Sequence, residues 1–307
     1  QPDRVSGPGR GPSRVDLSVV IPAYNEAEAI GPVIVALCGH LEQVESLRGR
    51  FEVLVVDDGS SDDTARIASG VNPFVKLVRH PHNIGNGAAI KTGIRNAQGR
   101  VIVFMDADAQ HDPVMVQRLY EGCADYDMVV GARGRGSQAG VHRSLANGVF
   151  NQLASYVTGR PVPDLTSGFR AIRRGVARRF AGLLPNGFSY PTTITLCLLR
   201  GGFSVDYQPI TAAKRVGKSK ISPAADGAKF LLVIAKICML FSPLKIFLPV
   251  SLYLFLMGLG YYGYTFYTAH RFTNMSMLLF TTAVIIFMMG LLAEQIALMR
   301  FERTEAE

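Results

Sequence analysis

Two long stretches without a charged residue limit the possible folds of this chain more than any other feature. They cover residues 246–267, IFLPVSLYLFLMGLGYYGYTFY, and 272–293, FTNMSMLLFTTAVIIFMMGLLA. As a helix, each stretch reaches roughly 33 Å, against about 30 Å for the hydrocarbon core of a bilayer. The alternative, two helices buried in a soluble core, would need surrounding apolar sequence that the C-terminal region does not supply. We therefore expect transmembrane helices over residues 246–267 and 272–299.

The connector TAHR is short, so the two helices are expected to form a hairpin. Lysine or arginine at positions 229, 236, 245, 300 and 303 flanks the open end of the hairpin, whereas the connector has only Arg271. The positive-inside rule then predicts a cytoplasmic N-terminal domain and a cytoplasmic tail over residues 300–307, in a bacterial inner membrane or its equivalent. Residues 223–245 space lysines among apolar residues, as in an amphipathic helix that lies on the membrane surface.

Composition narrows the range of partners. The net charge is +8, but the arginines are scattered and form no basic stripe with interleaved aromatic residues, so we expect no nucleic-acid partner. Anionic lipid and a phosphorylated substrate account for the charge better. Residues 1–14 lack the apolar region of a signal peptide and are expected to form a flexible tail. Glycines at 258, 260 and 263 can serve helix packing within one chain or between copies, so a homo-oligomer stays open.

Residues 15–222 alternate strand patterns with helix patterns. The strands, among them VLVV and VIVF, are continuous apolar runs and not alternating ones. Such strands are buried on both faces, as in a parallel sheet covered by helices, so the predicted fold class is α/β. Ligands of these sheets bind beyond the carboxyl ends of the strands, which is where the turns PAYNE, DDGS and DADAQ fall.

Carboxylates are concentrated in the turn after the strand VIVF. Asp106, Asp108 and Asp112 lie within one short segment, MDADAQHDP, where their mutual repulsion favours a bound cation. Oxygen donors without cysteine or paired histidine indicate Mg²⁺ or Mn²⁺ and not zinc. Asp112 is expected to cap the next helix. In the turn DDGSSDDT, Asp57 is predicted to contact a nucleoside, whereas the later acidic pair is expected to cap a helix.

Two glycine-containing motifs are weak matches to nucleotide-binding loops. NIGNGAAIKTG lacks the third glycine of the dinucleotide fingerprint and follows the third predicted strand instead of the first. RVGKSK has Ala212 where a phosphate-binding loop needs glycine. We therefore reject the dehydrogenase and ATPase interpretations.

Several motifs in a fixed order carry a family resemblance. VVIPAYNE, VVDDGSSDDT, NIGNGAAIKTGI, MDADAQHDP, GAR and DLTSGFR, followed by two apolar spans, resemble the family 2 glycosyltransferases of the GT-A fold. Within that family the chain is similar to polyprenyl-phosphate glycosyltransferases, including dolichol-phosphate mannose synthases. The resemblance covers about residues 15–220 and the hairpin. It implies a GT-A catalytic domain with a Rossmann-like, mostly parallel sheet.

The resemblance also implies roles for individual residues. Asp106 and Asp108 would be the catalytic pair, and Asp108 with Gln110 would hold Mg²⁺ or Mn²⁺ on the donor diphosphate. The nucleotide sugar would contact Pro22, Tyr24, Glu26, Asp57, Asp106 and Ala107. The acceptor phosphate would contact Arg133, Arg143, Ser167, Arg215 and Lys220, with a solvated surface as the alternative for Arg143 and Arg215.

The implied activity is the inverting transfer of a hexose from a nucleotide diphosphate sugar to a dolichyl or undecaprenyl phosphate. GDP-mannose, UDP-glucose and UDP-N-acetylglucosamine all remain open as donors. A processive polysaccharide synthase of the same superfamily would carry a Q-x-x-R-W motif, and this chain has no tryptophan. A catalytically silent membrane adaptor is the alternative from another class, and the intact acidic turns argue against it.

Overall fold

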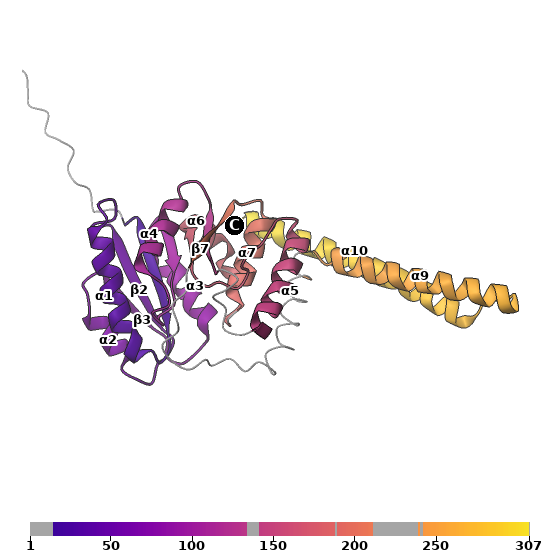
Figure 1. The fold of residues 1–307 in the computed structure, drawn as a ribbon, viewed down its shortest axis with the longest axis horizontal. Coiled ribbons are helices and arrows are strands. Elements are labelled where there is room, and N and C mark those ends of the chain that lie inside the picture. The colour runs from indigo at the N-terminus through magenta and orange to yellow at the C-terminus, as the bar shows by residue number, and fades with distance from the viewer. Residues whose placement is uncertain (1–14, 134–140, 188, 211–238, 240–241, 307) are drawn as a thin grey trace, which may run out of the picture. The chain divides into compact units, whose positions relative to one another are not determined.

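The computed structural model describes residues 15–133, 141–187, 189–210, 239 and 242–306 (Figure 1). The chain divides into two compact units, one of Gln1–Asn151 with Val162–Ser219 and the other of Gln152–Pro161 with Lys220–Glu307. The tail predicted over residues 1–14 and most of the amphipathic helix predicted over 223–245 lie outside the described residues. Arg215 and Lys220 lie outside them as well.

The first unit is built on a seven-stranded sheet with the strand order β3-β2-β1-β4-β6-β5-β7. Neighbouring strands are parallel except where β6 pairs with β4 and with β5. The predicted α/β class and mostly parallel sheet are therefore confirmed, and the antiparallel β6 is an addition that the sequence pattern does not predict. The strands are β1 Leu17–Ala23, β2 Phe51–Asp57, β3 Val75–Arg79, β4 Val101–Phe104, β5 Met128–Arg133, β6 Arg170–Arg173 and β7 Val205–Ile210.

Helices cover both faces of this sheet. On one face, strand side chains such as Val19 and Val53 share an apolar core with Leu37 of α1. On the other face, Gly93 of α3 lies directly against Val20. The continuous apolar strands are explained by this double cover. The helices of this unit are α1 Ala27–Gln43, α2 Thr64–Gly70, α3 Asn86–Asn96, α4 Pro113–Gly122, α6 Arg174–Phe180 and α7 Tyr190–Arg200, with a 3₁₀ turn at Ala181–Leu183. Helix α5, Val141–Thr158, begins in the first unit and ends in the second.

The glycines of NIGNG bring the start of α3 against the loop that precedes α7. Gly85 has a φ of +120°, and a Cβ atom there would lie 2.5 Å from the carbonyl oxygen of Asn186. A Cβ atom on Gly87 would lie 2.1 Å from the carbonyl oxygen of Pro185. The Ala88 N–H donates to the Asn186 carbonyl at 3.1 Å. This close approach of two backbones explains the glycine motif without any bound dinucleotide.

We expect Gly87→Ala to destabilise the first unit by about 1–3 kcal/mol, because the main chain that the new methyl group meets cannot move aside cheaply. Gly39→Ala in α1 is the matched control, since a Cβ atom there would meet nothing within 4 Å. The control should gain about 0.4–1 kcal/mol through the smaller entropy of its unfolded chain. Denaturant unfolding of both variants in detergent tests the difference. Equal stability of the two would contradict the packing at Gly87.

The second unit contains an antiparallel helical hairpin of α9, Leu244–Ala269, and α10, Asn274–Ala306. Small side chains line the contact between the two helices at every seventh position. This spacing matches the repeat of a left-handed helix pair and lets the backbones approach closely. Gly258 packs on Leu279 and Phe280, so this glycine serves the hairpin itself. The buried series are Ser251, Gly258 and Thr265 on α9 and Ser276, Ala283, Gly290 and Ala297 on α10.

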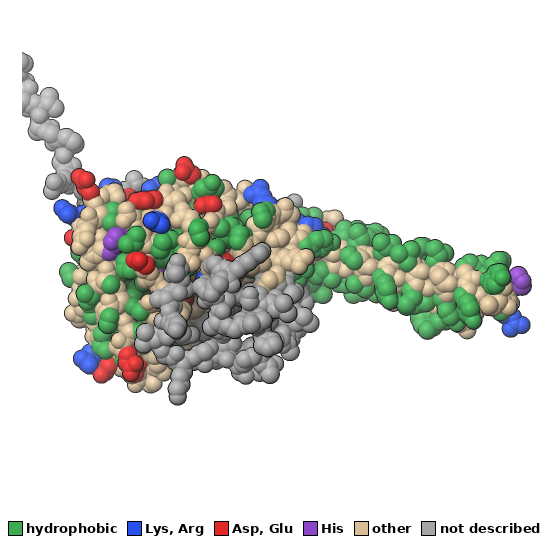
Figure 2. All heavy atoms as spheres, in the orientation of Figure 1, with side chains coloured by type: hydrophobic (Ala, Val, Ile, Leu, Met, Phe, Trp, Pro, Cys, Tyr) green, Lys and Arg blue, Asp and Glu red, His purple; other side chains and the backbone are tan. Residues whose placement is uncertain are grey.

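The face of the hairpin that Figure 2 shows is apolar over most of its length, and both helices carry many exposed large apolar side chains. In windows of α9 and α10 that are long and apolar enough to cross a membrane, only 11% and 17% of the residues are buried. Two core helices of a soluble protein would be mostly covered, so this alternative is wrong for the described structure.

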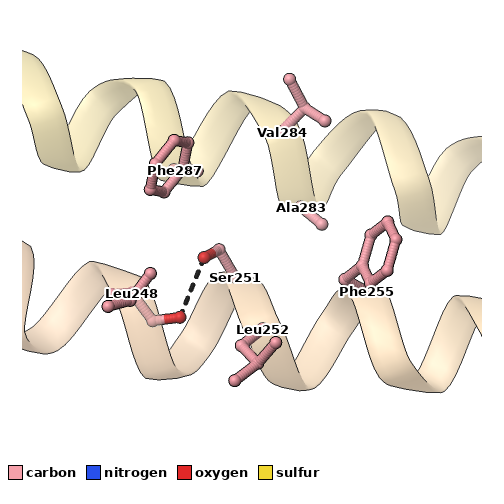
Figure 3. Close-up of a pocket in the computed structure, with 7 residues that line it drawn as sticks. All are labelled: Leu248, Ser251, Leu252, Phe255, Ala283, Val284 and Phe287. Atoms are coloured by element: carbon pink, nitrogen blue, oxygen red, sulfur yellow. Dashed lines mark hydrogen bonds between the residues drawn. The ribbon is translucent and has the colours of Figure 1, made fainter.

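A shallow groove between the helices is lined by Leu252, Phe255 and Phe287 among others (Figure 3). Ser251 also lines this groove, and its hydroxyl donates to the Leu248 carbonyl at 2.9 Å. A hydroxyl that is satisfied within its own helix is compatible with a lipid environment.

Candidate active site

The turns after β1 and β2 are hydrogen-bonded to each other at the carboxyl edge of the sheet. The Asn25 N–H donates to Ser60 Oγ at 2.9 Å. Asp62 accepts from the Ala27 N–H at the start of α1 and from the Thr64 N–H at the start of α2. Partial burial opposes ionisation of Asp62, but these hydrogen bonds lower its pKa. The capping role predicted for Asp62 and Asp63 is therefore confirmed for Asp62 and wrong for Asp63, whose carboxylate makes no cap and pairs with Arg66 instead.

The two aspartates of DDGS have different environments. Asp57 is fully buried, with Oδ1 accepting from the Ser60 N–H at 3.0 Å and Oδ2 3.0 Å from Arg79 Nε. That ion pair lacks hydrogen-bond alignment, so Oδ2 keeps acceptor capacity. Asp58 instead accepts from His80 at 2.7 Å and from the main-chain N–H groups of residues 84 and 85. Asp58 thus holds the glycine loop in place, a role that the sequence pattern did not reveal.

The residues predicted to surround the donor nucleotide lie at this same edge. Pro22 and Asp57 are at the carboxyl ends of paired strands, since Pro22 is in register with Val56 and Ala23 with Asp57. Tyr24 is 37% exposed, and Pro22 and Glu26 are half-buried. The structure therefore brings these side chains to one rim, and their contact with a nucleotide stays a prediction.

The DADAQ turn follows β4 on the same rim. The Asp106 side chain is 42% exposed, while Ala107 and Asp108 are buried, at 4% and 7% exposure. Ala109 has a φ of +59°, and this left-handed residue turns the chain so that the Gln110 N–H donates to Asp108 Oδ1 at 3.3 Å. Asp108 and Gln110 consequently belong to one tight turn, with Asp106 more open to solvent.

The chemistry of this donor set fits a hard divalent cation. Carboxylates at 106 and 108 and the amide of Gln110 offer only oxygen atoms, which Mg²⁺ and Mn²⁺ prefer. In the part of the chain that the structure describes, no three His, Cys, Asp or Glu side chains form a metal-binding group. Asp112 has a separate task, because its Oδ1 accepts from the Val114 N–H at 2.9 Å. The predicted cap of the next helix is thereby confirmed.

Arg133, at the end of β5, forms a two-pronged ion pair with Asp164. Its Nε and Nη2 lie 2.9 and 3.1 Å from the two carboxylate oxygens, and Nη2 also donates to Thr166 at 2.7 Å. Burial opposes the charge of each partner. Even so, the pair raises the pKa of Arg133 and lowers the pKa of Asp164, and Asp106 adds to the effect on Arg133. The guanidinium is therefore fixed, charged and within the field of Asp106.

The other acceptor residues predicted from the resemblance are less exposed to a ligand or lie outside the description. Ser167 is 2% exposed, and its hydroxyl donates to the Gly131 carbonyl at 2.7 Å. In this structure Ser167 anchors its loop to β5 and does not face an open site. Arg143 belongs to α5, but its side chain is outside the described set, as are Arg215 and Lys220.

A buried arginine holds the loop DLTSGFR through hydrogen bonds to the loop and to α7. Arg170 is fully buried and donates to the carbonyls of Ser167 and Pro191 and to Thr195 Oγ1. Burial lowers its pKa, and within the described residues no carboxylate pairs with it. Tyr190 is also buried, and its hydroxyl lies 3.4 Å from the Gly168 carbonyl. Burial and the nearby Asp106 both raise the pKa of Tyr190, so its hydroxyl stays protonated.

Two family models match this chain. The model described as Glycosyl transferase family 2 matches residues 18–180, and the model described as GtrB C-terminal hairpin matches residues 242–299. Together with the sheet and its acidic rim, these matches define a glycosyltransferase with a GT-A type of fold followed by an apolar hairpin. The chain belongs to glycosyl transferase family 2.

The curated relatives that this chain matches are also named as sugar transferases. An undecaprenyl-phosphate 4-deoxy-4-formamido-L-arabinose transferase of Sodalis glossinidius is 36% identical over 174 residues, covering 54% of this chain and 51% of the relative. A transferase of the same description from Pseudomonas savastanoi pv. phaseolicola is 31% identical over 224 residues, covering 67% of this chain and 61% of the relative. The chain thus spans about half to three fifths of the length of these relatives.

Solved structures agree on the fold. Glucosyl-3-phosphoglycerate synthase from Mycobacterium tuberculosis, crystallised with Mn²⁺, UDP and phosphoglyceric acid, superposes with a TM-score of 0.57 at 21% identity. The match covers 73% of this chain and 78% of that protein. At this identity the likeness supports the GT-A architecture alone.

Proposed function

We propose that this chain is an inverting hexosyltransferase that moves a sugar from a nucleotide diphosphate sugar to the phosphate of a polyprenyl lipid. One observation carries the proposal. An oxygen-donor turn, Asp106 to Gln110, and a fixed, charged arginine, Arg133, lie at the same edge of one sheet, in a chain that also contains a membrane-length hairpin. The relatives are named for transfer to undecaprenyl phosphate, which supports a lipid phosphate as the acceptor.

The chemistry of such an acceptor explains why no general base is needed. A phosphate monoester has a second pKa near 6 and is already an anionic nucleophile at neutral pH. The enzyme must instead bring two polyanions together in alignment. Arg133 is suited to the acceptor phosphate, because a planar guanidinium recognises phosphate oxygens directionally. Asp106, the more exposed aspartate, would contact the donor sugar.

The donor side would use the remaining rim residues. Pro22, Tyr24 and Glu26 would line the nucleoside pocket, and Asp57, which is fully buried in the ligand-free structure, would contact the nucleoside once its carboxylate becomes exposed on binding. Mg²⁺ or Mn²⁺, held by Asp108 and Gln110, would neutralise charge on the departing nucleoside diphosphate. The lipid phosphate oxygen attacks the anomeric carbon, the bond to the diphosphate oxygen breaks, and the configuration inverts.

The hairpin would anchor the enzyme in the membrane that holds the lipid. Its two helices return the chain to one side, so the catalytic unit and the C-terminal tail would share the cytoplasmic compartment, as the distribution of lysine and arginine predicts. A donor made in the cytoplasm and an acceptor phosphate at the bilayer surface would meet there.

The full-length protein in detergent tests this function. It is supplied with Mg²⁺ or Mn²⁺, undecaprenyl or dolichyl phosphate, and labelled GDP-mannose, UDP-glucose, UDP-N-acetylglucosamine or nucleotide-linked 4-deoxy-4-formamido-L-arabinose in turn. We expect one donor to give a labelled, organic-extractable lipid, and the free polyprenol without phosphate to give none. Nucleotide binding without glycolipid from any donor would refute the proposal.

A further inference from the structure

His111 lies directly beside the DADAQ turn and is held by an aromatic stack. Its ring is parallel to the ring of Phe169, with centroids 4.2 Å apart and an interplanar angle of 9°. The His111 side chain is only 8% exposed, and its Nε2 atom lies 3.9 Å from Oδ2 of Asp106. The histidine thus contacts the turn on one side and the loop DLTSGFR on the other.

The stacking partner is rigid. Phe169 is fully buried, and its carbonyl accepts from the Gly131 N–H at 2.9 Å. Nearby residues of the same loop are held as well, Ser167 by its bond to Gly131 and Arg170 by its bonds to the start of α7. A ring stacked on this platform keeps its plane, which limits the directions in which the His111 Nε2 atom can point.

The Asp106 carboxylate has the glycine of DLTSGFR as another neighbour. Gly168 lies beside this carboxylate, since a Cβ atom there would lie 3.5 and 3.8 Å from its two oxygens. Position 168 has no side chain that could orient Asp106, and the same Cβ atom would lie 3.2 Å from the Tyr190 hydroxyl. His111 therefore offers a ring nitrogen beside this carboxylate, while Arg133 acts on the same group through its charge.

We propose that His111 is a positioning residue, which orients the Asp106 carboxylate toward the donor sugar by a hydrogen bond that closes when substrate binds. The proposal rests on the proposed function of Asp106. The present separation of 3.9 Å exceeds a hydrogen bond, and catalytic hydrogen bonds are often long in a ligand-free enzyme and tighten in the substrate complex. A rotation of the carboxylate alone can shorten this distance.

The test compares His111→Ala with His111→Gln in the full-length enzyme, using the donor that the wild type turns over. Outer partners of a reactive group typically contribute 10–100-fold, so His111→Ala should lower kcat by about tenfold or more. The KM for the donor should stay within about twofold, because the nucleotide contacts are untouched. The glutamine variant, whose amide nitrogen reaches a similar position, should recover part of the loss.

A double-mutant cycle with Asp106→Asn separates positioning from a general structural role. If His111 acts through Asp106, then His111→Ala should change kcat by less than about twofold in the Asp106→Asn background. His40→Ala is the control, since His40 joins α1 to α4 through Gln117 at 3.1 Å, away from the rim. Additive losses, or a glutamine variant as impaired as the alanine variant, would overturn the proposal. A wild type that forms no glycolipid would instead refute the proposed function.

Discussion

The Asp108→Ala variant should form glycolipid about 10³-fold more slowly than the wild type while it still folds. Asp108 is the buried carboxylate of the DADAQ turn and the charged member of the proposed metal-binding pair. A metal contributes several kcal/mol to stabilising the leaving group, and about 4 kcal/mol corresponds to a 10³-fold change in rate. The expected loss is measured as initial rates at saturating donor. Mn²⁺ titration followed by electron paramagnetic resonance, with nucleoside diphosphate present, should show weaker binding.

Asp112→Ala is the matched control for this prediction, because it removes a carboxylate four positions along the same segment. Its side chain caps α4 through the Val114 N–H, so its loss should cost about 1 kcal/mol of stability. The turnover of this variant should remain close to that of the wild type at a temperature where both are folded. If the two variants lost activity equally, the division of the segment into a metal-binding part and a capping part would be incorrect.

The strands that the sequence predicts are those that the parallel sheet buries on both faces. β1, β2 and β4 contain the apolar runs VVIPA, VLVV and VIVF, and burial of this kind produces such runs. β6 has the sequence RAIR, in which Arg170 is fully buried and Arg173 is half-buried. Its strand conformation depends on pairing with β4 and β5 and on acceptors from the distant helix α7. No local pattern encodes those partners.

The candidate site shows the same division between local and long-range information. Acidic turns at strand ends locate the rim, because parallel neighbours end at one edge. The different tasks of Asp57 and Asp58 could not be predicted, since Asp58 is satisfied by residues 80, 84 and 85. His111 also looked unremarkable in the sequence, because its importance comes from a stack with Phe169, which is distant in the chain. Only the folded structure brings these residues together.

Loss of the two-pronged ion pair between Arg133 and Asp164 is expected to give the largest change in the free energy of unfolding. Asp164 is 3% exposed and accepts from Arg133 and from the main-chain N–H groups of Thr166 and Ser167. Arg133→Ala would leave this carboxylate buried without its counter-ion, which typically costs about 3–5 kcal/mol. Denaturant unfolding should show the loss at pH 7. An alanine variant within 1 kcal/mol of the wild type would mean that solvent replaces the guanidinium.

The same pair predicts how stability depends on pH. The pKa of Asp164 is lowered in the folded state, whereas an unfolded aspartate titrates near pH 3.9. The stabilisation from ionised Asp164 is therefore fully present above about pH 4 and is lost as the pH falls through the folded pKa. The stability difference between the wild type and Asp164→Asn should be constant from pH 7 to 5 and shrink below pH 4. A difference that shrinks already near pH 6 would point to another group.

Arg133→Lys separates the structural role of this arginine from its proposed contact with the acceptor. Lysine keeps the charge but cannot hold Asp164 with two parallel bonds and present a third donor to a phosphate. We expect the KM for polyprenyl phosphate to rise by about tenfold, with the KM for the nucleotide sugar unchanged. Arg173→Lys is the matched control, because Arg173 pairs with Asp127 at 3.4 Å and is in register with Val101 at the start of β4, on the opposite edge of the sheet. If both variants lose stability and neither changes the acceptor KM, Arg133 acts only through Asp164, and the acceptor phosphate is bound by other residues.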